Sequence, residues 1–416
     1  MTASLCKWAA VFLTGSLLVV TGCASRGEIK GNMQRMQWAV EEQVDMAPAF
    51  EWAGGKDRES VLTALWAGPG IAVLPVYNLT AAPAPLKDIE QLLSAALAQR
   101  GAVMLDKQIL EEFMSSRRMR YTGGLDREIA SALAEQTGVE AVLVTTLEYF
   151  EDGNPPKISL HTRLVSTGPE PEILWMDSVC RAGDDAPGLL DLGVISDSQD
   201  LVKRAADELA DSLIAHLAGE VQHGSGKDLE EGIGPTVFYR EPGMDFNGGL
   251  KVAVIPFFNL SERPYAWEIM PLHFVRSMLD SPGFRVLEPG VVRRALLQTR
   301  VMVRGGLSGP HLGLILSTTD ADLVVSGSVM HYLDSPYAAL DPEVEFSVQV
   351  YERKSRKVVW TSRSVARGGD GVYFFNKGFR STACRLGSEL SRATIASMTS
   401  EAAESVSATN TEGTVP

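Results

Sequence analysis

The stretch Ile71–Thr80, IAVLPVYNLT, has a second copy, VAVIPFFNLS, at Val252–Ser261. Each copy is a short apolar, β-branched run followed by proline, an aromatic residue and Asn-Leu-Thr or Asn-Leu-Ser. Such a run, bounded by turn residues, predicts a buried strand that ends at the proline and continues into a loop. We expect the asparagine and hydroxyl side chains to satisfy backbone groups of that loop.

The sequence after each copy repeats as well. The matched segments are Gly101–Leu105 with Gly283–Leu287, Gly123–Leu125 with Gly305–Leu307, and Thr137 with Thr319. In all three pairs the offset is 182 residues. A constant offset over this distance predicts a duplicated domain.

Apolar periodicity predicts the same order of elements in both copies: strand, helix, strand, two helices, a three-stranded meander and a closing helix. Asp126 is placed to cap one of these helices. The segments Ile158–Val165 and Val344–Tyr351 alternate apolar and polar residues, which predicts half-exposed strands. We expect Trp175 and Trp360, beside the hairpins, to be core residues.

This order predicts an α/β (α+β) fold in two tandem copies of a three-layer-type domain, each with a mixed sheet flanked by helices. The expected boundaries are residues 1–22 for a signal peptide, 23–69 for a lipidated N-terminal tether, 70–220 for the first domain, 221–249 for a linker, 250–400 for the second domain and 401–416 for a disordered tail.

The N-terminus has the pattern of an export signal. Lys7 precedes the apolar stretch Trp8–Val20, which has the length of a signal-peptide core and is short for a membrane span. Val20-Thr-Gly-Cys23 resembles the lipobox of bacterial lipoproteins, which implies acylation of Cys23, palmitate included, and anchoring in the outer membrane because Ala24 follows. The alternative is a plain secretory signal with an incidental cysteine.

Composition narrows the classes of partner. The chain has 416 residues, is 45% hydrophobic and 22% charged, and carries a net charge of −14. The amino-acid composition is that of an ordinary globular protein, and a chain this acidic makes nucleic acid an unfavourable partner.

Two cysteines, Cys180 and Cys384, remain once Cys6 and Cys23 are assigned to the signal and the anchor. We expect two separately buried thiols, with a bridge between domains as the alternative.

No catalytic or cofactor-binding motif is present, so we expect a protein that is not an enzyme and has no cofactor or metal site. The Gly-Gly-Leu turns at Gly123 and Gly305 precede helices, where free amides would suit an anion. A tight turn that excludes Cβ atoms is the simpler interpretation.

Arginines cluster at matching places in both copies. They are Arg117, Arg118 and Arg120 in the first copy and Arg293, Arg294, Arg300 and Arg304 in the second. A solvated face is the default for such clusters. In an acidic chain they are also candidates for contact with an acidic partner or with the other domain.

The repeated stretches Ala72–Thr80 and Ala253–Ser261, with Asp322–Val329 and Lys357–Trp360, resemble the family of periplasmic lipoprotein domains that includes CsgG, LpoB and the N-terminal domain of TolB. The resemblance implies this fold in both domains. Neither copy has room for the long hairpins of a CsgG-type secretion channel, and tandem duplication differs from the single-domain LpoB activator.

The resemblance and the lipobox together predict a non-enzymatic lipoprotein of the outer membrane. It would face the periplasm, hold the membrane through acyl chains on Cys23, and bind periplasmic or outer-membrane proteins in envelope assembly or secretion. The alternative is a homo-oligomeric ring or collar subunit of a secretion or motility apparatus.

Overall fold

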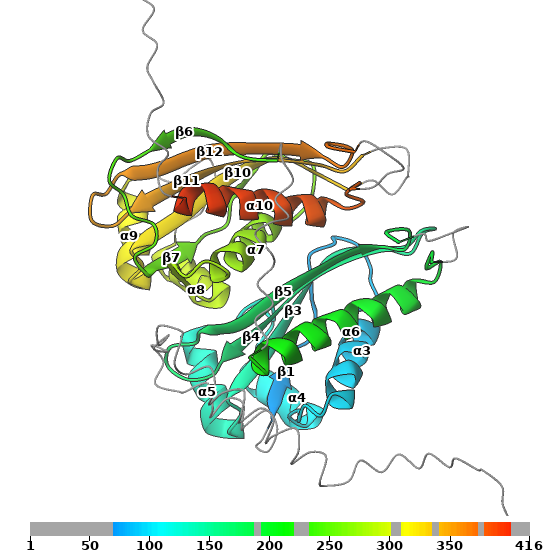
Figure 1. Ribbon diagram of the computed structural model, residues 1–416. Helices are drawn as coiled ribbons and strands as arrows, with labels where there is room; N and C mark the ends of the chain where they lie inside the picture. The colour runs from blue at the N-terminus through cyan, green and yellow to red at the C-terminus, as the bar shows by residue number, and fades with distance from the viewer. Residues whose placement is uncertain are drawn as a thin grey trace, which may run out of the picture. The chain divides into compact units, whose positions relative to one another are not determined.

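The computed structural model describes residues 70–186, 193–219, 233–300, 309–334, 341–372 and 378–400. All of them belong to one compact unit, Glu51–Pro416. The fold is mixed α/β, with two mixed sheets flanked by helices, so the predicted fold class is confirmed (Figure 1). The expected signal peptide, tether and tail, with Cys23, lie outside the described residues. None of the helices in the described ranges is long and apolar enough to cross a membrane.

The first repeat follows the predicted order, except that the strand predicted at Ala102–Leu105 is only an isolated bridge. Its elements are β1 (Ile71–Val73), β2 (Tyr77–Asn78), α3 (Leu86–Gln99), α4 (Lys107–Ser116), α5 (Arg127–Thr137), β3 (Ala141–Glu151), β4 (Lys157–Ser166), β5 (Ile173–Ala182) and α6 (Ser198–Leu217). The sheet order is β1-β3-β4-β5, and β2 also pairs with β3. β1 and β2 run parallel to β3, whereas β3, β4 and β5 form an antiparallel meander.

The second repeat has the same plan. Its elements are β6 (Thr236–Arg240), β7 (Leu250–Val254), β8 (Phe258–Asn259), α7 (Ala266–Leu279), β9 (Phe284–Val286), α8 (Pro289–Thr299), α9 (Gly309–Thr319), β10 (Leu323–Leu333), β11 (Glu343–Glu352), β12 (Val358–Arg367) and α10 (Ala383–Thr399). The sheet order is β6-β12-β11-β10-β7-β9, with β8 paired to β10. β6 falls in the range expected to be a linker and was not predicted as a strand.

The strand register reproduces the duplication seen in the sequence. Tyr77 of β2 pairs with Thr146, and its counterpart Phe258 of β8 pairs with Ser328. Thr146 and Ser328 are therefore equivalent positions on the two central strands. The same register defines the equivalent positions on the other paired strands.

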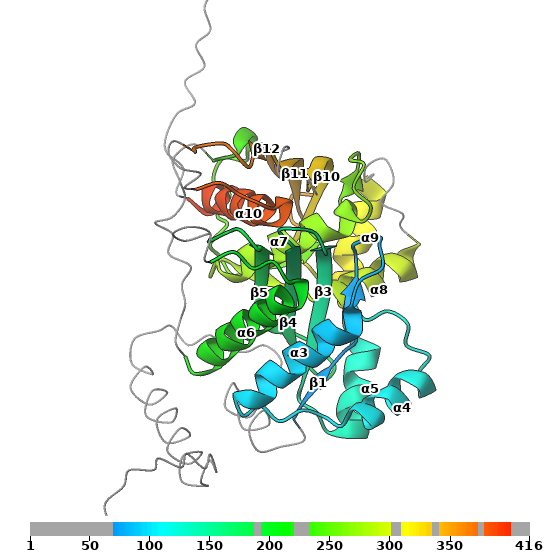
Figure 2. The ribbon, with the colours of Figure 1, turned by 90° about the vertical axis from the view of Figure 1, so that its right-hand side faces the viewer.

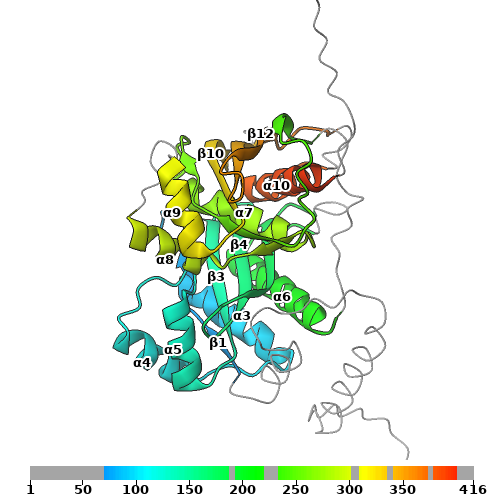
Figure 3. The same cartoon turned by 90° about the vertical axis from the view of Figure 1, so that its left-hand side faces the viewer.

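Helices cover both faces of each sheet. In the first repeat, α3 and α6 pack over Leu143 and Leu160 of one face (Figure 2), and α4 and α5 pack over Val142 of the other. In the second repeat, α7 and α10 pack around Phe346, and α8 and α9 pack over Val324 (Figure 3). Trp175 and Trp360 are 6% and 1% exposed, which confirms them as core residues.

β4 differs from the prediction of a half-exposed strand. His161 and Arg163 are both 0% exposed. The polar side of β4 is buried because the second repeat covers it: His161 lies 4.7 Å, centroid to centroid, from the ring of His273 in α7. Alternation correctly predicted a strand with one polar side, but an intramolecular partner takes the place of solvent on that side.

A second difference concerns the predicted strand at Ala102–Leu105. It is reduced to an isolated bridge between Ile71 and Met104, whereas its counterpart in the second repeat is a strand, β9. Phe284 and Val286 bury large side chains on the core side of β9, whereas their counterparts are Ala102, which offers only a methyl group, and Met104, which is only partly buried. The smaller apolar contact explains the weaker strand.

The predicted cap of α5 is confirmed. The carboxylate of Asp126 accepts a hydrogen bond of 3.0 Å from the backbone N–H of Ile129. The helix ends at Gly138, which has the left-handed backbone (φ 73°) that glycine adopts without steric cost.

Candidate functional site

The loops after the two repeated strands are built by the Asn-Leu-Thr and Asn-Leu-Ser residues, as predicted. Asn78 donates to the carbonyl of Ala82 and accepts from the N–H of Thr80, at 2.9 Å each. Asn259 makes the same pair of bonds with Arg263 and Ser261, at 2.9 and 3.0 Å. These bonds hold both loops in a fixed shape beside the junction of the two repeats.

A cavity of about 730 Å³ lies at that junction. Both repeats line it: the first supplies Tyr77, Leu79, Tyr121, Gly123 and Thr146, and the second supplies mainly residues of β8, α7 and α8 with their flanking loops. Aromatic side chains are prominent in the wall, namely Tyr77, Tyr121, Phe257, Phe258, Tyr265 and Trp267. The volume and the apolar lining are typical of a ligand-binding pocket.

One carboxylate, Glu268 of α7, lies in this aromatic wall. The hydroxyls of Tyr77 and Tyr121 each donate to it over a long 3.4 Å. Burial raises the pKa of Glu268, and its partners only partly oppose that effect. Burial, reinforced by the charge of Glu268, also raises the pKa of Tyr77 to about 12 and that of Tyr121 further. Both phenols therefore stay neutral at physiological pH.

Thr146 adds an unsatisfied polar group to the lining. It is 1% exposed, and its hydroxyl has no hydrogen-bond partner among the described residues. A buried hydroxyl without a partner costs free energy, of the order of 1–3 kcal/mol. A ligand that offers a hydrogen bond would remove that cost.

The arginine clusters divide between two environments. The guanidinium of Arg293 lies 4.0 Å from the ring centroid of Tyr121, at the cavity wall, and Arg294 forms a 3.1 Å ion pair with Glu128. These two arginines of the second repeat thus contact the first repeat, one of the uses that the sequence suggested. Arg117, Arg118, Arg120 and Arg300 are exposed, and Arg304 lies outside the described residues.

The turn at Gly123 binds an anionic group of the protein itself, the carboxylate of Glu288. The N–H of Leu125 donates to a carboxylate oxygen of Glu288 over 3.0 Å. Arg163 binds the same carboxylate through two hydrogen bonds of 2.9 and 2.8 Å, and also donates to the carbonyl of Gly123 over 2.7 Å. The equivalent turn at Gly305 lies outside the described residues.

Cys180 and Cys384 form a disulfide between the two repeats. The expectation of two separate thiols was wrong. The two cysteines are 204 residues apart and occupy different places in the two repeats, so the sequence offered no sign that β5 and the start of α10 are neighbours.

Sequence reasoning missed the cavity residues Tyr77, Tyr121, Trp267 and Glu268. Tyr77 belongs to the repeated stretch, but its role as a lining residue depends on the second repeat. Glu268 did carry a signal. It is a single acidic residue in the strongly apolar segment Ala266–Val275, AWEIMPLHFV, and a charge there calls for a buried partner or a ligand.

Comparison with known proteins adds little. No protein-family model and no curated protein matches the chain. PelC of Paraburkholderia phytofirmans, solved as a dodecamer, is 17% identical over 40% of this chain and 99% of its own (TM-score 0.28). The LpoB C-terminal domain of Salmonella enterica is 12% identical over 30% of this chain and 87% of its own, with a TM-score of 0.24. Lipoprotein GNA1162 of Neisseria meningitidis is 20% identical over 31% of this chain and 90% of its own, with a TM-score of 0.25. Likenesses this weak say nothing about function.

Proposed function

We propose that this chain is a non-enzymatic lipoprotein that is anchored in the outer membrane through acyl chains on Cys23 and faces the periplasm. In this proposal it binds a protein partner in cell-envelope assembly or secretion, and a segment of the partner occupies the aromatic cavity. The cavity between the repeats is the observation that carries the proposal, and the lipobox motif supports the anchor.

The lining favours a partner segment that carries a lysine or arginine between apolar side chains. Arg293 already lies over the ring of Tyr121, and the other aromatic faces of the wall, with the carboxylate of Glu268, would attract a further cation. Because burial raises the pKa of Glu268, a cationic ligand group would stabilise its ionised form. The apolar wall would take up the flanking aliphatic or aromatic side chains.

Binding fits the described lining better than catalysis. The raised pKa values of Tyr77 and Tyr121 keep both phenols protonated at neutral pH, so neither is present as a phenolate base and both are weak acids. No histidine, serine or cysteine is among the described residues that line this cavity, so the serine–histidine and cysteine–histidine pairs of nucleophilic enzymes are absent from that set.

Photo-crosslinking in cells tests the cavity. A photoreactive amino acid would replace Leu297, which lines the cavity and is 56% exposed, and Ile109 of α4, which is 47% exposed and outside it, would be the control position. We expect one discrete protein adduct from position 297 and none from 109. The adduct should fall at least ten-fold when Glu268→Gln or Trp267→Ala is added. An adduct that persists in both variants, or forms equally from 109, would refute the cavity as the binding site.

A separate experiment tests the anchor. Cys23→Ser should abolish incorporation of radiolabelled palmitate and release the protein from the outer-membrane fraction, while Cys6→Ser, in the signal segment, should change neither. Retention of Cys23→Ser in the membrane fraction would count against acylation at this residue.

One observation favours the alternative of a homo-oligomeric ring or collar. The register places Gln349 at the position equivalent to the buried Arg163, and Gln349 is exposed. On the neighbouring β12, Val365 is 54% exposed. Gln349 and Val365 are thus exposed on the face that corresponds to the covered face of the first repeat, and another copy would fit there. Light scattering distinguishes the two: a large uniform mass that Val365→Glu reduces supports the ring, and a monomer rejects it.

A further inference from the structure

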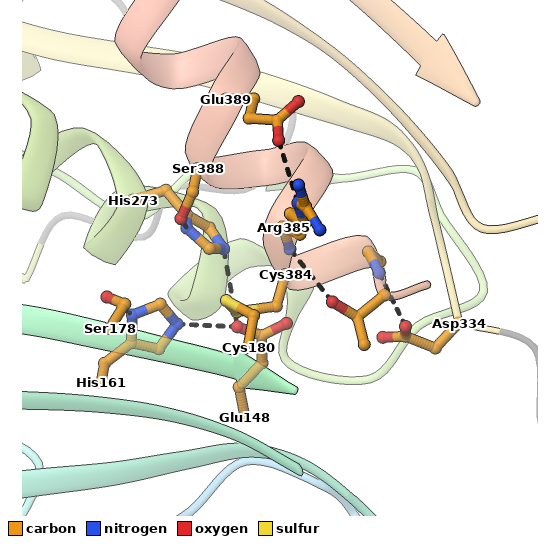
Figure 4. Close-up of a disulfide and its surroundings, with 12 residues drawn as sticks. Glu148, His161, Ser178, Cys180, His273, Asp334, Cys384, Arg385, Ser388 and Glu389 are labelled. Carbon is orange, nitrogen blue, oxygen red and sulfur yellow. Dashed lines mark hydrogen bonds and ion pairs between the residues drawn. A yellow bond between two sulfur atoms is a disulfide. The ribbon is translucent and has the colours of Figure 1, made fainter. Parts of the chain in front are cut away.

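A second, distinct cluster of chemically active side chains lies between the repeats. Its members come from four elements: Glu148 of β3, His161 of β4, His273 of α7 and Cys384 of α10 (Figure 4). All four are buried, with exposures of 0% or 1%. One potential ligand atom from each lies within 4.8 Å of the others.

Glu148 is the centre of the cluster. One of its carboxylate oxygens, Oε2, is 2.7 Å from Nε2 of His161 and 3.5 Å from Nε2 of His273. Burial acts to raise the pKa of Glu148, but the hydrogen bonds with the two histidines outweigh it and hold the pKa below its usual range. Burial lowers the pKa of His273, so its imidazole stays neutral.

The outer nitrogen of each imidazole is held by a serine. Nδ1 of His161 is 2.7 Å from the hydroxyl of Ser178, and Nδ1 of His273 is 3.1 Å from that of Ser388. The hydroxyl of Tyr332 donates to the other carboxylate oxygen of Glu148 over 2.6 Å and lies 3.0 Å from Nε2 of His273. Hydrogen bonds of this kind orient metal-binding histidines and carboxylates in proteins.

We propose that Glu148, His161, His273 and Cys384 bind one zinc ion when the disulfide between Cys180 and Cys384 is reduced. The donors would be Nε2 of each histidine, a carboxylate oxygen and a thiolate. Zinc accepts such a mixed N, S and O set in four-coordinate sites, whereas calcium and magnesium require oxygen donors. The proposal is independent of what the aromatic cavity binds.

A dithiol can reduce the disulfide between Cys180 and Cys384. The dithiol gives two electrons and two protons to the S–S bond and leaves as a disulfide, so Cys180 and Cys384 become thiols. On binding, the thiol proton of Cys384 passes to solvent, since zinc takes cysteine as the thiolate, and each neutral imidazole binds through Nε2 with its proton on Nδ1, next to its serine hydroxyl. The ion would then link the same strands and helices that the disulfide links.

Two serine variants of the mature chain give a matched test. Both lack the disulfide, but Cys180→Ser keeps the proposed sulfur ligand and Cys384→Ser removes it. Each would be titrated with cobalt(II), a coloured substitute for zinc, without any reductant. We expect Cys180→Ser to bind one equivalent, with the visible bands of tetrahedral cobalt and a sulfur-to-cobalt charge-transfer band, and added zinc to displace it. Cys384→Ser should lose that band and bind at least ten-fold more weakly.

The unsubstituted chain supplies a second measurement that no folding defect can mimic. After reduction with dithiothreitol and its anaerobic removal, it should bind one equivalent of cobalt(II), and the oxidised chain should give no charge-transfer band. Reduced His273→Gln should lose binding, whereas His331→Gln, at a histidine whose side chain is 61% exposed, should not. Equal binding by the two serine variants, or no binding by the reduced chain, would overturn the proposal.

Discussion

Arg163 of β4 and Glu288, the residue that caps α8, form a buried two-point ion pair between the repeats. Their side chains are 0% exposed, and the guanidinium and carboxylate meet at 2.9 and 2.8 Å. Such a pair is a weak source of net stability, because both charges lose their hydration. Its larger effect is on specificity: each charge makes a wrong placement of the other repeat costly.

Removing one partner of this pair should be strongly destabilising. In Arg163→Met the carboxylate of Glu288 keeps, among the described residues, the N–H groups of Leu125 and Gly290, at 3.0 and 3.3 Å. We expect the free energy of unfolding in urea to fall by about 3–5 kcal/mol. Arg294→Ala breaks the exposed pair with Glu128 and should cost less than about 1 kcal/mol. An equal loss of unfolding free energy in the two variants would mean that Arg163 and Glu288 are no more buried from solvent than the exposed pair.

Much of each repeat was predictable, and the contact between the repeats was not. The copies at Ile71 and Val252, the Asn78 and Asn259 loops and the Asp126 cap depend on neighbours in sequence, so periodicity and turn chemistry reveal them. The Arg163–Glu288 pair and the disulfide join residues 125 and 204 positions apart. Such contacts depend on how the repeats pack, which no local pattern encodes.

Two glycines mark where the backbones of the repeats meet. A Cβ atom on Gly290 would lie 2.3 Å from the nitrogen of Leu125, and one on Gly124 would lie 2.8 Å from the nitrogen of Gly290. Gly290→Ala should therefore force the repeats apart and lower the free energy of unfolding by about 1–3 kcal/mol.

Gly313 in α9 is the control for this substitution, since no atom of the described residues outside its own helix turn lies within 4 Å of its Cβ position. Gly313→Ala should raise the free energy of unfolding by about 0.5–1 kcal/mol, because alanine favours the helix. Urea unfolding of both variants measures the contrast. A Gly290→Ala protein as stable as Gly313→Ala would show that the two backbones do not approach closely.

The disulfide closes a loop over a sequence separation of 204 residues, which restricts the unfolded chain. In buffer free of metal ions, we expect reduction to lower the free energy of unfolding by about 2–5 kcal/mol. The double variant Cys180→Ser/Cys384→Ser should match the reduced chain and show no response to dithiothreitol. A response of the double variant would mean that the reductant acts elsewhere.

Asp334 should make stability depend on pH. It accepts the N–H of Ala383 over 2.7 Å through one oxygen, and the other has no hydrogen-bond partner among the described residues. Burial, followed by the charge of Glu148, raises its pKa from 3.8 to about 6. The folded chain thus holds a proton at Asp334 that the unfolded chain has released between these two values. Its contribution to stability is complete below about pH 4 and is lost as the pH rises through 6.

Asp334→Asn tests this sign, because asparagine cannot ionise and still offers an oxygen to the N–H of Ala383. Urea unfolding of both proteins at pH 4, 5, 6 and 7 measures the difference in the free energy of unfolding. The difference should shift in favour of the variant by about 2 kcal/mol between pH 4 and 7, since one pKa unit corresponds to about 1.4 kcal/mol. Other groups that titrate in both proteins cancel in this comparison. A difference that stays constant with pH would show that Asp334 releases its proton as readily in the folded chain as in the unfolded one.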